Sequence, residues 1–368
     1  MSLAGLRTGV PLAPLTTLGL GGPARHLLPC PSVESVAAGV RLAGERGWPL
    51  AVLGGGSNVV VADEGFPGLV LKMEIGGLAF RRKGEWTFVT AGAGESWDGL
   101  VAACLERGLR GLECLSGIPG TVGAAPIQNI GAYGQEVAQT LLSVTCLDRS
   151  TLKTVNIPRS ECGFGYRTSR FKAADRDRLI VLGVTLRLSE GAPDESRYPE
   201  LAEVLAKPRP PADHRSALQA VRDAVLSLRR SKAMVIDPAE PESRSAGSFF
   251  LNPVLTEGDF DRLRAEHGPI PSFPAPGGVK VPAAWLVEHS GFPKGFSGGG
   301  AGISTKHALA LVNRGGSAAD LLALASAIEQ AVRLRFGIGL EREPVVIGFR
   351  PSSRAPRSPG RWRPCSPG

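Results

Sequence analysis

Two glycine-rich segments are the residues in this chain best suited to bind a charged ligand. Gly54-Gly55-Gly56-Ser57-Asn58 follows an apolar stretch typical of a strand, and residues 116–123 (Ser-Gly-Ile-Pro-Gly-Thr-Val-Gly) follow a stretch typical of a helix. Glycine leaves backbone N–H groups bare at tight turns, so a diphosphate can approach them closely. Each segment, taken alone, also fits a tight turn with a purely structural role.

The common nucleotide-binding and hydrolase motifs are excluded. No G-x-G sequence in the chain has the third glycine of the dinucleotide fingerprint, and no G-K-S or G-K-T sequence occurs. Gly295-Phe296-Ser297-Gly298-Gly299 matches the G-x-S-x-G pattern of hydrolases by letters only. A nucleophile elbow requires a strand before the motif and a helix directly after it, and neither is predicted here. Any nucleotide must therefore be bound in another way.

Arg167 is the basic side chain with the most distinctive setting. It lies among aromatic residues and glycines in the stretch 163–172, where a partly buried arginine can hold a carboxylate in bidentate fashion. The five histidines have no spacing typical of a zinc site, so no metal is expected.

Periodicity and turn residues divide the chain into regions of mixed helix and strand, which predicts an α+β fold. The first region, residues 1–79, contains a helix capped by Ser32 that ends near Gly47. The expected strands of that region are 49–53, 59–61 and 69–71. The second region, residues 80–190, contains a helix at 96–107 and strands at 87–89, 143–147 and 179–188.

The third region, residues 191–348, begins with a stretch rich in proline. Five prolines between positions 189 and 215 argue against a helix or central strand, and indicate a linker or functional loop there. Beyond it the pattern predicts helices at 217–230, 282–289 and 317–336, and strands at 247–251 and 345–348.

Composition and charge exclude several classes of protein. Hydrophobic residues make up 43% and charged residues 21% of the 368 residues, as in a globular protein. The net charge of +8 suggests nucleic-acid binding, but residues 349–368 contain five arginines and no acidic residue, leaving +3 for the rest. That tail is predicted to be disordered. Six scattered cysteines without a C-x-x-C pair favour the cytoplasm, and neither a signal peptide nor a membrane span is expected.

Six separated motifs, in the order in which they occur along the chain, resemble those of the UDP-N-acetylenolpyruvoylglucosamine reductase family. The resemblance covers about residues 16–348. The motifs are Leu53-Gly54-Gly55-Gly56-Ser57-Asn58, Gly117-Ile118-Pro119-Gly120-Thr121-Val122-Gly123, Pro126-Ile127-Gln128-Asn129-Ile130-Gly131-Ala132-Tyr133-Gly134, Gly165-Tyr166-Arg167, Ala246-Gly247-Ser248-Phe249-Phe250-Leu251-Asn252-Pro253 and Leu340-Glu341-Arg342-Glu343.

The resemblance implies a fold, a cofactor and a reaction. It implies two FAD-binding subdomains of the vanillyl-alcohol-oxidase type, at 1–79 and 80–190, and a C-terminal α+β substrate domain within 191–348. FAD would be bound without a covalent link and reduced by NADPH. The reduced flavin would then transfer hydride to the enolpyruvyl group of UDP-N-acetylglucosamine enolpyruvate, which places negative charge on the substrate carboxylate. No specific nucleic-acid or membrane partner is implied.

The same resemblance assigns roles to individual residues. Arg167 and Glu343 would stabilise the anionic intermediate, and Ser248 would protonate the neighbouring carbon. Glu343 could help by being protonated, which needs a raised pKa, or by orienting other donors. Substrate contacts are implied for Tyr166, Tyr198, Lys232 and Asn252. FAD contacts are implied for Gly54, Gly55, Gly56, Ser57, Asn58, Gly117, Ile118, Pro119, Gly120 and Gly123.

Three residues and the function itself leave alternatives open. Pro344 follows Glu343 where the family more often has valine, and proline removes a strand donor, so the geometry around Glu343 is in question. Ser248 also fits a simple turn residue, and Lys232 a solvated charge at a helix end. The rival functions are an FAD-dependent sugar or alcohol oxidase of the same fold and a nucleic-acid-binding protein.

Overall fold

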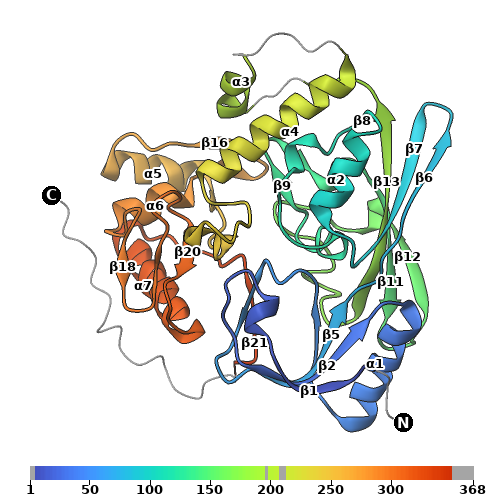
Figure 1. Ribbon diagram of the computed structural model, residues 1–368. Coiled ribbons are helices and arrows are strands. Elements are labelled where there is room, and N and C mark those ends of the chain that lie inside the picture. The colour runs from blue at the N-terminus through green and yellow to red at the C-terminus, as the bar shows by residue number, and fades with distance from the viewer. Residues whose placement is uncertain (1–4, 195–197, 207–212, 350–368) are drawn as a thin grey trace. The chain divides into compact units, whose positions relative to one another are not determined.

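The computed structural model describes residues 5–194, 198–206 and 213–349, and the chain forms two compact units (Figure 1). Among these residues, unit 1 comprises 5–10, 23–56 and 66–235, and unit 2 comprises 11–22, 57–65 and 236–349. Both units are discontinuous in sequence. The glycine segment 54–58 therefore crosses from unit 1 into unit 2 after Gly56. The predicted basic tail, apart from Phe349, lies outside the described residues.

Unit 1 contains a sheet in the order β1-β2-β5-β3, in which β5 pairs in parallel with β2 and with β3. Its strands are β1 (Arg7–Pro11), β2 (Pro23–Cys30), β5 (Phe66–Met73) and β3 (Leu50–Leu53). Helix α1 (Val33–Arg46) packs its apolar side, including Val36 and Val40, against this sheet. Ser32 caps its first turn and Gly47, at φ +62°, ends it. The predicted helix and its caps are confirmed.

A second sheet in unit 1 is six-stranded and antiparallel. Its order is β12 (Thr154–Pro158), β11 (Leu141–Asp148), β13 (Leu179–Glu190), β7 (Trp86–Gly92) and β6 (Leu78–Lys83), with β8 (Leu109–Arg110) also pairing with β13. Helix α2 (Trp97–Leu105) covers its apolar face through Trp97, Leu100 and Val101. The predicted strands and helix of this region are confirmed, with boundaries shifted by a few residues.

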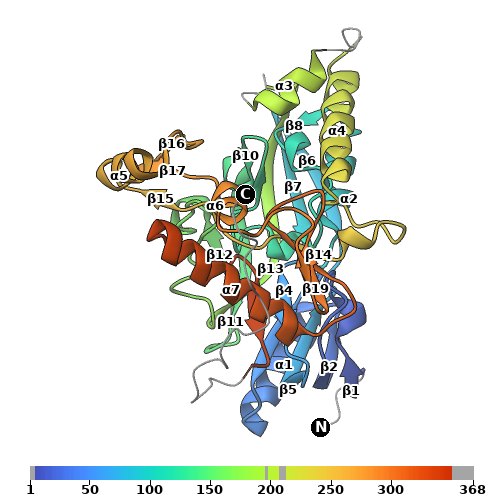
Figure 2. The same ribbon diagram turned by 90° about the vertical axis from the view of Figure 1, so that its left-hand side faces the viewer.

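The proline-rich stretch differs from its prediction as a loop. Helix α3 (Pro199–Leu205) lies inside it, and α4 (His214–Ser231) begins before its end. Pro199 occupies the first turn of α3, where a missing backbone N–H costs no intrahelical hydrogen bond. Leu201 of α3 is fully buried and packs in one cluster with Val221 and Val225 of α4. The two helices α3 and α4 lie side by side (Figure 2). Positions 195–197 and 207–212 are outside the described residues.

Unit 2 has its own core, built around a small sheet and three helices. The sheet order is β14 (Ser245–Ser248), β20 (Ala310–Asn313), β19 (Ala301–Ile303) and β18 (Ser297–Gly298). A second sheet has the order β15 (Val254–Leu255), β17 (Gly278–Lys280) and β16 (Phe273–Ala275), and β4 (Val59–Val61) pairs in parallel with β21 (Val345–Ile347). The helices are α5 (Glu257–His267), α6 (Ala283–His289) and α7 (Ala318–Phe336).

Helix α7 shows how unit 2 joins distant parts of the sequence. Ser317 and Asp320 form a reciprocal capping box at its start. The Asp63 carboxylate, which follows β4, also accepts hydrogen bonds from Ala318 N and Ala319 N, at 2.7 and 2.9 Å. A negative charge at this end also suits the helix dipole. The short segment 57–65 is thereby held within the C-terminal part of the fold.

Candidate active site

The two glycine segments predicted to bind a diphosphate contact each other in unit 1. A Cβ atom added to Gly54 would lie 2.4 Å from Thr121 Oγ1, and one added to Gly55 would lie 2.6 Å from Gly120 Cα. Larger side chains at either glycine would push the segments apart. The glycines therefore allow a close approach of the two segments. We call the two segments, residues 54–56 and 116–123, the glycine cradle.

The second glycine segment is held in place from the start of α2. Trp97 N donates to Gly120 O at 3.1 Å, and Val122 N donates to Glu95 O at 2.9 Å. A Cβ on Gly123 would lie 2.6 Å from Ala93 Cβ, so this position also requires glycine. Ile118 packs partly buried against the core of unit 1. These contacts fix the position of the predicted cofactor-binding backbone.

Asp98 links this segment to helix α4. Its carboxylate accepts hydrogen bonds from Gly117 N at 2.6 Å and from Arg222 Nη1 and Nη2 at 2.7 Å each. Burial raises the pKa of Asp98, but the bonds from Arg222 and Gly117 outweigh it and leave the pKa below its usual value. Sequence patterns do not predict the pairing of Asp98 with Arg222, because it spans 124 residues and has no local signal.

The next residues of the first glycine segment belong to unit 2. Asn58 Nδ2 donates to Glu343 O at 3.3 Å, and Asn58 O accepts Val345 N at 3.0 Å. Pro344 precedes β21, which starts at Val345, so the missing N–H removes no hydrogen bond from that strand. The backbone on both sides of Pro344 therefore keeps its hydrogen bonds, at Glu343 O and at Val345 N.

Arg167 has a strained backbone and a fixed guanidinium plane. Its φ is +52°, an unusual value for a residue with a side chain. Nη1 donates to Asn129 O at 3.3 Å, Nη2 donates to Gly131 O, and the guanidinium lies 5.5 Å from the centre of the Tyr166 ring. A Cβ on Gly131 would lie 2.8 Å from Nη1. The motif at 126–134 therefore forms the support of Arg167.

Asn129 is the centre of that support. It is 1% exposed and has φ +46°. Its Nδ2 donates to Glu136 Oε2 at 2.9 Å and to Gly165 O at 3.0 Å, while its Oδ1 accepts Ala138 N at 3.1 Å. These bonds join β9 (Gly131–Ala132) and β10 (Gln135–Glu136) to the turn before Arg167. Asn129 falls within the motif at 126–134, but the motif alone predicts no role for it.

Ser248 and Glu343 lie on paired segments of unit 2. Glu343 N donates to Phe249 O at 2.9 Å, and Leu251 N donates to Glu341 O at 2.9 Å. Ser248 ends β14, directly before Phe249. The structure therefore brings together two of the three predicted catalytic residues. The third, Arg167, belongs to unit 1.

The predicted substrate-binding residues are divided between the units. In unit 1, Tyr198 precedes α3 and its ring meets the edge of Tyr133, with 5.2 Å between ring centres. Lys232, at the C-terminal end of α4, donates from Nζ to Glu200 Oε2 at 2.6 Å. In unit 2, Asn252 Oδ1 accepts Ala283 N at 2.8 Å and so caps the start of α6. Tyr166 is 38% exposed.

Metal and thiol chemistry have no support in the described residues. No group of three or more histidine, cysteine or acidic side chains there could hold a metal ion. Cys30, Cys104, Cys114, Cys146 and Cys162 are free and buried. Burial raises the pKa of the first four to about 12 and of Cys162 to about 11, so these thiols stay protonated at neutral pH. No helix within the described ranges is long and apolar enough to cross a membrane.

Comparison with known families defines the class of protein first. The model of an FAD-binding domain matches residues 24–155, the stretch that contains both glycine segments. The chain is therefore a flavoprotein. The model of the C-terminal domain of UDP-N-acetylenolpyruvoylglucosamine reductase matches residues 237–347, which include Ser248 and Glu343.

Whole-chain relatives then define the family. A UDP-N-acetylenolpyruvoylglucosamine reductase of Thermobifida fusca (strain YX) is 49% identical over 350 residues, covering 92% of this chain and 97% of the relative. One of Mycobacterium avium (strain 104) is 45% identical over 367 residues, covering 94% and 96%. The crystal structure of UDP-N-acetylenolpyruvylglucosamine reductase from Thermus caldophilus matches with a TM-score of 0.63 at 29% identity, covering 93% and 100%. The chain belongs to the UDP-N-acetylenolpyruvoylglucosamine reductase family.

These findings confirm the resemblance and the α+β fold with an FAD-binding region followed by a C-terminal domain. The chain is an oxidoreductase of peptidoglycan precursor synthesis. The C-terminal match also favours the reductase over the alternative of an FAD-dependent sugar or alcohol oxidase.

Proposed function

We infer that this chain reduces the enolpyruvyl group of UDP-N-acetylglucosamine enolpyruvate to give UDP-N-acetylmuramate, with bound FAD and with NADPH as the reductant. The observation that carries this inference is the match of residues 237–347 to the C-terminal domain of this reductase family, in a chain whose residues 24–155 match an FAD-binding domain. The reaction takes place in the cytoplasm, where NADPH is available, and its product supports cell-wall synthesis, cell shape and division.

The composition of the glycine cradle suits the diphosphate of FAD. Gly54 and Gly55 lie against Thr121 and Gly120 with no room for a Cβ. Backbone N–H groups in turns without side chains can bind an anion. We propose that Gly54, Gly55, Gly56, Ser57, Asn58, Gly117, Ile118, Pro119, Gly120 and Gly123 hold this cofactor. Bound FAD would supply hydride transfer from NADPH to the enol ether. We propose FAD-binding subdomains at residues 1–79 and 80–190 and a substrate region within 191–348. The compact units differ from these bounds, because residues 11–22 and 57–65 belong to unit 2 and the described residues between 191 and 235 belong to unit 1.

Arg167 is proposed to stabilise the negative charge that develops on the substrate carboxylate. An arginine stays charged at any working pH and offers donors in one plane, which suits two carboxylate oxygens. The bonds from Arg167 to Asn129 O and Gly131 O support this role because they fix the plane before substrate arrives. Little reorganisation is then needed during the reaction.

Ser248 is proposed to give its hydroxyl proton to the substrate carbon next to the one that receives hydride. Glu343 is proposed to stabilise the same anionic intermediate, either protonated or by orienting other donors. The hydrogen bond from Glu343 N to Phe249 O supports joint action because it keeps the two segments in register. Tyr166, Tyr198, Lys232 and Asn252 are proposed to bind the substrate, Tyr198 and Lys232 at its diphosphate and Asn252 near its nucleotide.

An anaerobic spectroscopic titration of the purified protein tests the function. We expect the visible absorbance of the flavin to bleach when NADPH is added and to return when UDP-N-acetylglucosamine enolpyruvate follows. Return of the colour with oxygen alone, and not with the substrate, would instead support the oxidase alternative. A colourless protein that cannot be reconstituted with FAD would refute both.

A further inference from the structure

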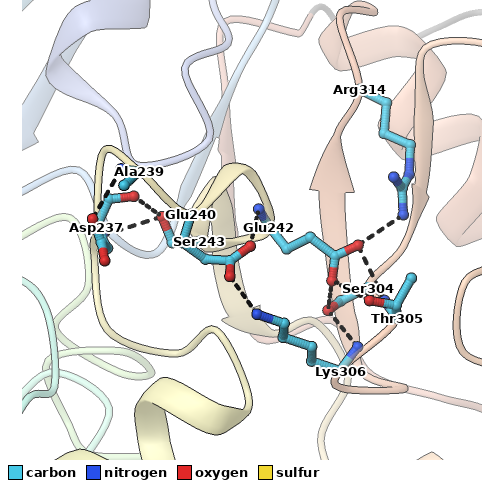
Figure 3. Close-up of polar contacts among 9 residues, drawn as sticks. All are labelled: Asp237, Ala239, Glu240, Glu242, Ser243, Ser304, Thr305, Lys306 and Arg314. Atoms are coloured by element: carbon cyan, nitrogen blue, oxygen red, sulfur yellow. Dashed lines mark hydrogen bonds and ion pairs between the residues drawn. The ribbon is translucent and has the colours of Figure 1, made fainter.

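Glu242 is a nearly buried carboxylate that precedes the Ser248 segment. It lies in the turn Pro241–Ser243 of unit 2, and its side chain is 12% exposed. Figure 3 shows the donors that converge on it: Ser304 Oγ at 2.7 Å, Thr305 N and Thr305 Oγ1 at 2.9 Å each, and Arg314 Nη2 at 3.0 Å. We call these four residues the Glu242 clasp.

The clasp binds the charged form of the carboxyl group. Burial raises the pKa of Glu242, but hydrogen bonds from Ser304 and Thr305 and the charge of Arg314 outweigh it, so the pKa lies below its ordinary value. Four donors around one carboxylate satisfy most of its acceptor capacity. None of these four residues is proposed to react with the substrate. The role of the clasp therefore depends on the chain segments that it connects.

The donors of the clasp lie on the chain that pairs with Ser248. Ser304 N donates to Ala310 O at 2.9 Å, and Ala310 is the register partner of Ser248 in the sheet. One residue before Ala310, Leu309 O accepts Phe249 N at 2.8 Å. The Glu242 carboxylate therefore connects the residues that lead into β14 with the turn that leads into its partner strand.

The strand around Ser248 needs such support. The pairing of β14 with β20 is irregular between Ser245 and Ser248, and Gly247 has φ +73°. A register irregularity leaves a residue outside the regular hydrogen-bond ladder, so the ladder alone does not fix the direction of the Ser248 side chain. Arg314 completes the clasp by lying over Gly302, where a Cβ would be 2.6 Å from Arg314 Nε.

We propose that Glu242 is a positioning residue that holds Ser248 in the orientation needed for proton transfer, an inference that rests on the role proposed for Ser248. Its ionised carboxylate acts through the turn 304–309 and not through contact with substrate. Asp261, on helix α5 of the same unit, provides a control carboxylate that does not bond the turn 304–309. It pairs with Arg264 at 3.1 Å, and its side chain is 63% exposed.

The test compares Glu242→Gln, Asp261→Asn, Ser248→Ala and the double variant Glu242→Gln/Ser248→Ala as FAD-loaded proteins in anaerobic stopped-flow experiments. For Glu242→Gln we expect flavin reduction by NADPH within about two-fold of wild type and reoxidation by the enolpyruvyl substrate at least about ten-fold slower. Asp261→Asn should resemble wild type in both steps. The double variant should be no slower than Ser248→Ala, because Glu242 acts only through Ser248.

The outcomes separate the two proposals. If Ser248→Ala reoxidises at the wild-type rate, the role proposed for Ser248 fails. If Ser248→Ala is slow but Glu242→Gln is not, or if the two effects multiply in the double variant, the positioning role of Glu242 is wrong. Equal slowing of both half-reactions by Glu242→Gln would indicate a general structural role, which also overturns the proposal. Arg314→Met removes one donor of the clasp and leaves the Glu242 carboxylate in place. This variant replaces Glu242→Gln in the test if Glu242→Gln does not fold.

Discussion

At the scale of single residues, the proposed chemistry depends on how the neighbours of Arg167 hold it. A residue with a side chain at φ +52° is under backbone strain of about 1–2 kcal/mol, which other contacts must offset. Those contacts come from Asn129 and Gly131, whose carbonyl oxygens accept the guanidinium N–H groups. The strain therefore coincides with a side chain that is oriented before it meets a ligand.

Replacement of Arg167 by lysine tests this orientation. We expect Arg167→Lys to slow flavin reoxidation by substrate about 100-fold, because a single ammonium cannot replace a planar fork of donors. Flavin reduction by NADPH should change little. Single-turnover kinetics of the two half-reactions provide the measurement, with Arg170→Lys as a control, since Arg170 pairs with Asp175 at 2.6 Å. Unchanged turnover in Arg167→Lys would remove this residue from the mechanism.

At the scale of elements, helix α4 supports the glycine cradle through one ion pair. Arg222 on α4 and the Gly117 N–H share the Asp98 carboxylate, so a helix and a cofactor-binding turn depend on one group. Asp98 is partly exposed, with 37% of its side chain accessible, and the pair therefore contributes modestly to stability. Its larger effect should be on the position of Gly117.

Asp98→Asn should weaken FAD binding by about ten-fold, as is typical when the support of a ligand-binding group is lost. Since folding lowers the pKa of Asp98, its contribution to stability is complete above the unfolded value of 3.8 and is lost as the pH falls through the lower folded value. The wild-type protein should therefore lose more stability than Asp98→Asn in that acid range. Fluorescence titration of apoprotein with FAD and melting curves against pH measure both effects.

Glu190→Gln is the control for this element-scale prediction. It breaks the exposed pair between Arg82 and Glu190, in which the side chains are 66% and 43% accessible. Its FAD affinity should equal that of wild type. An unchanged affinity in Asp98→Asn as well would mean that the Gly117 turn keeps its position without the ion pair.

At the scale of the whole molecule, the basic charge is concentrated at the C-terminus. Residues 349–368 hold five arginines and no acidic residue, out of a net charge of +8. Deleting them should abolish retention on a polynucleotide column at low salt, because such binding depends on phosphate neutralisation. Reductase activity should stay unchanged. Retention by the shortened chain would place a nucleic-acid-binding surface within residues 1–348.

Local sequence determined much of the secondary structure. Helix α1 begins after Ser32 and ends before Gly47 because a capping serine, apolar spacing and a left-handed glycine all act within a few residues. The same holds for α7, between Ser317 and Gly337. The prediction for 189–215 was wrong at α3, because proline disfavours helix interiors but not the first turn.

The sequence by itself also determined the family, since six ordered motifs are far more specific than any one of them. Only the tertiary structure decided why those motifs contain the residues they do. Positions 54 and 55 need glycine because Thr121 and Gly120 lie against them. Asn129 is buried where its backbone oxygen accepts a hydrogen bond from Arg167. The Glu242 clasp and the Asp98–Arg222 pair had no local signal. Periodicity and capping act over a few residues, whereas these contacts join positions dozens of residues apart that only folding brings together.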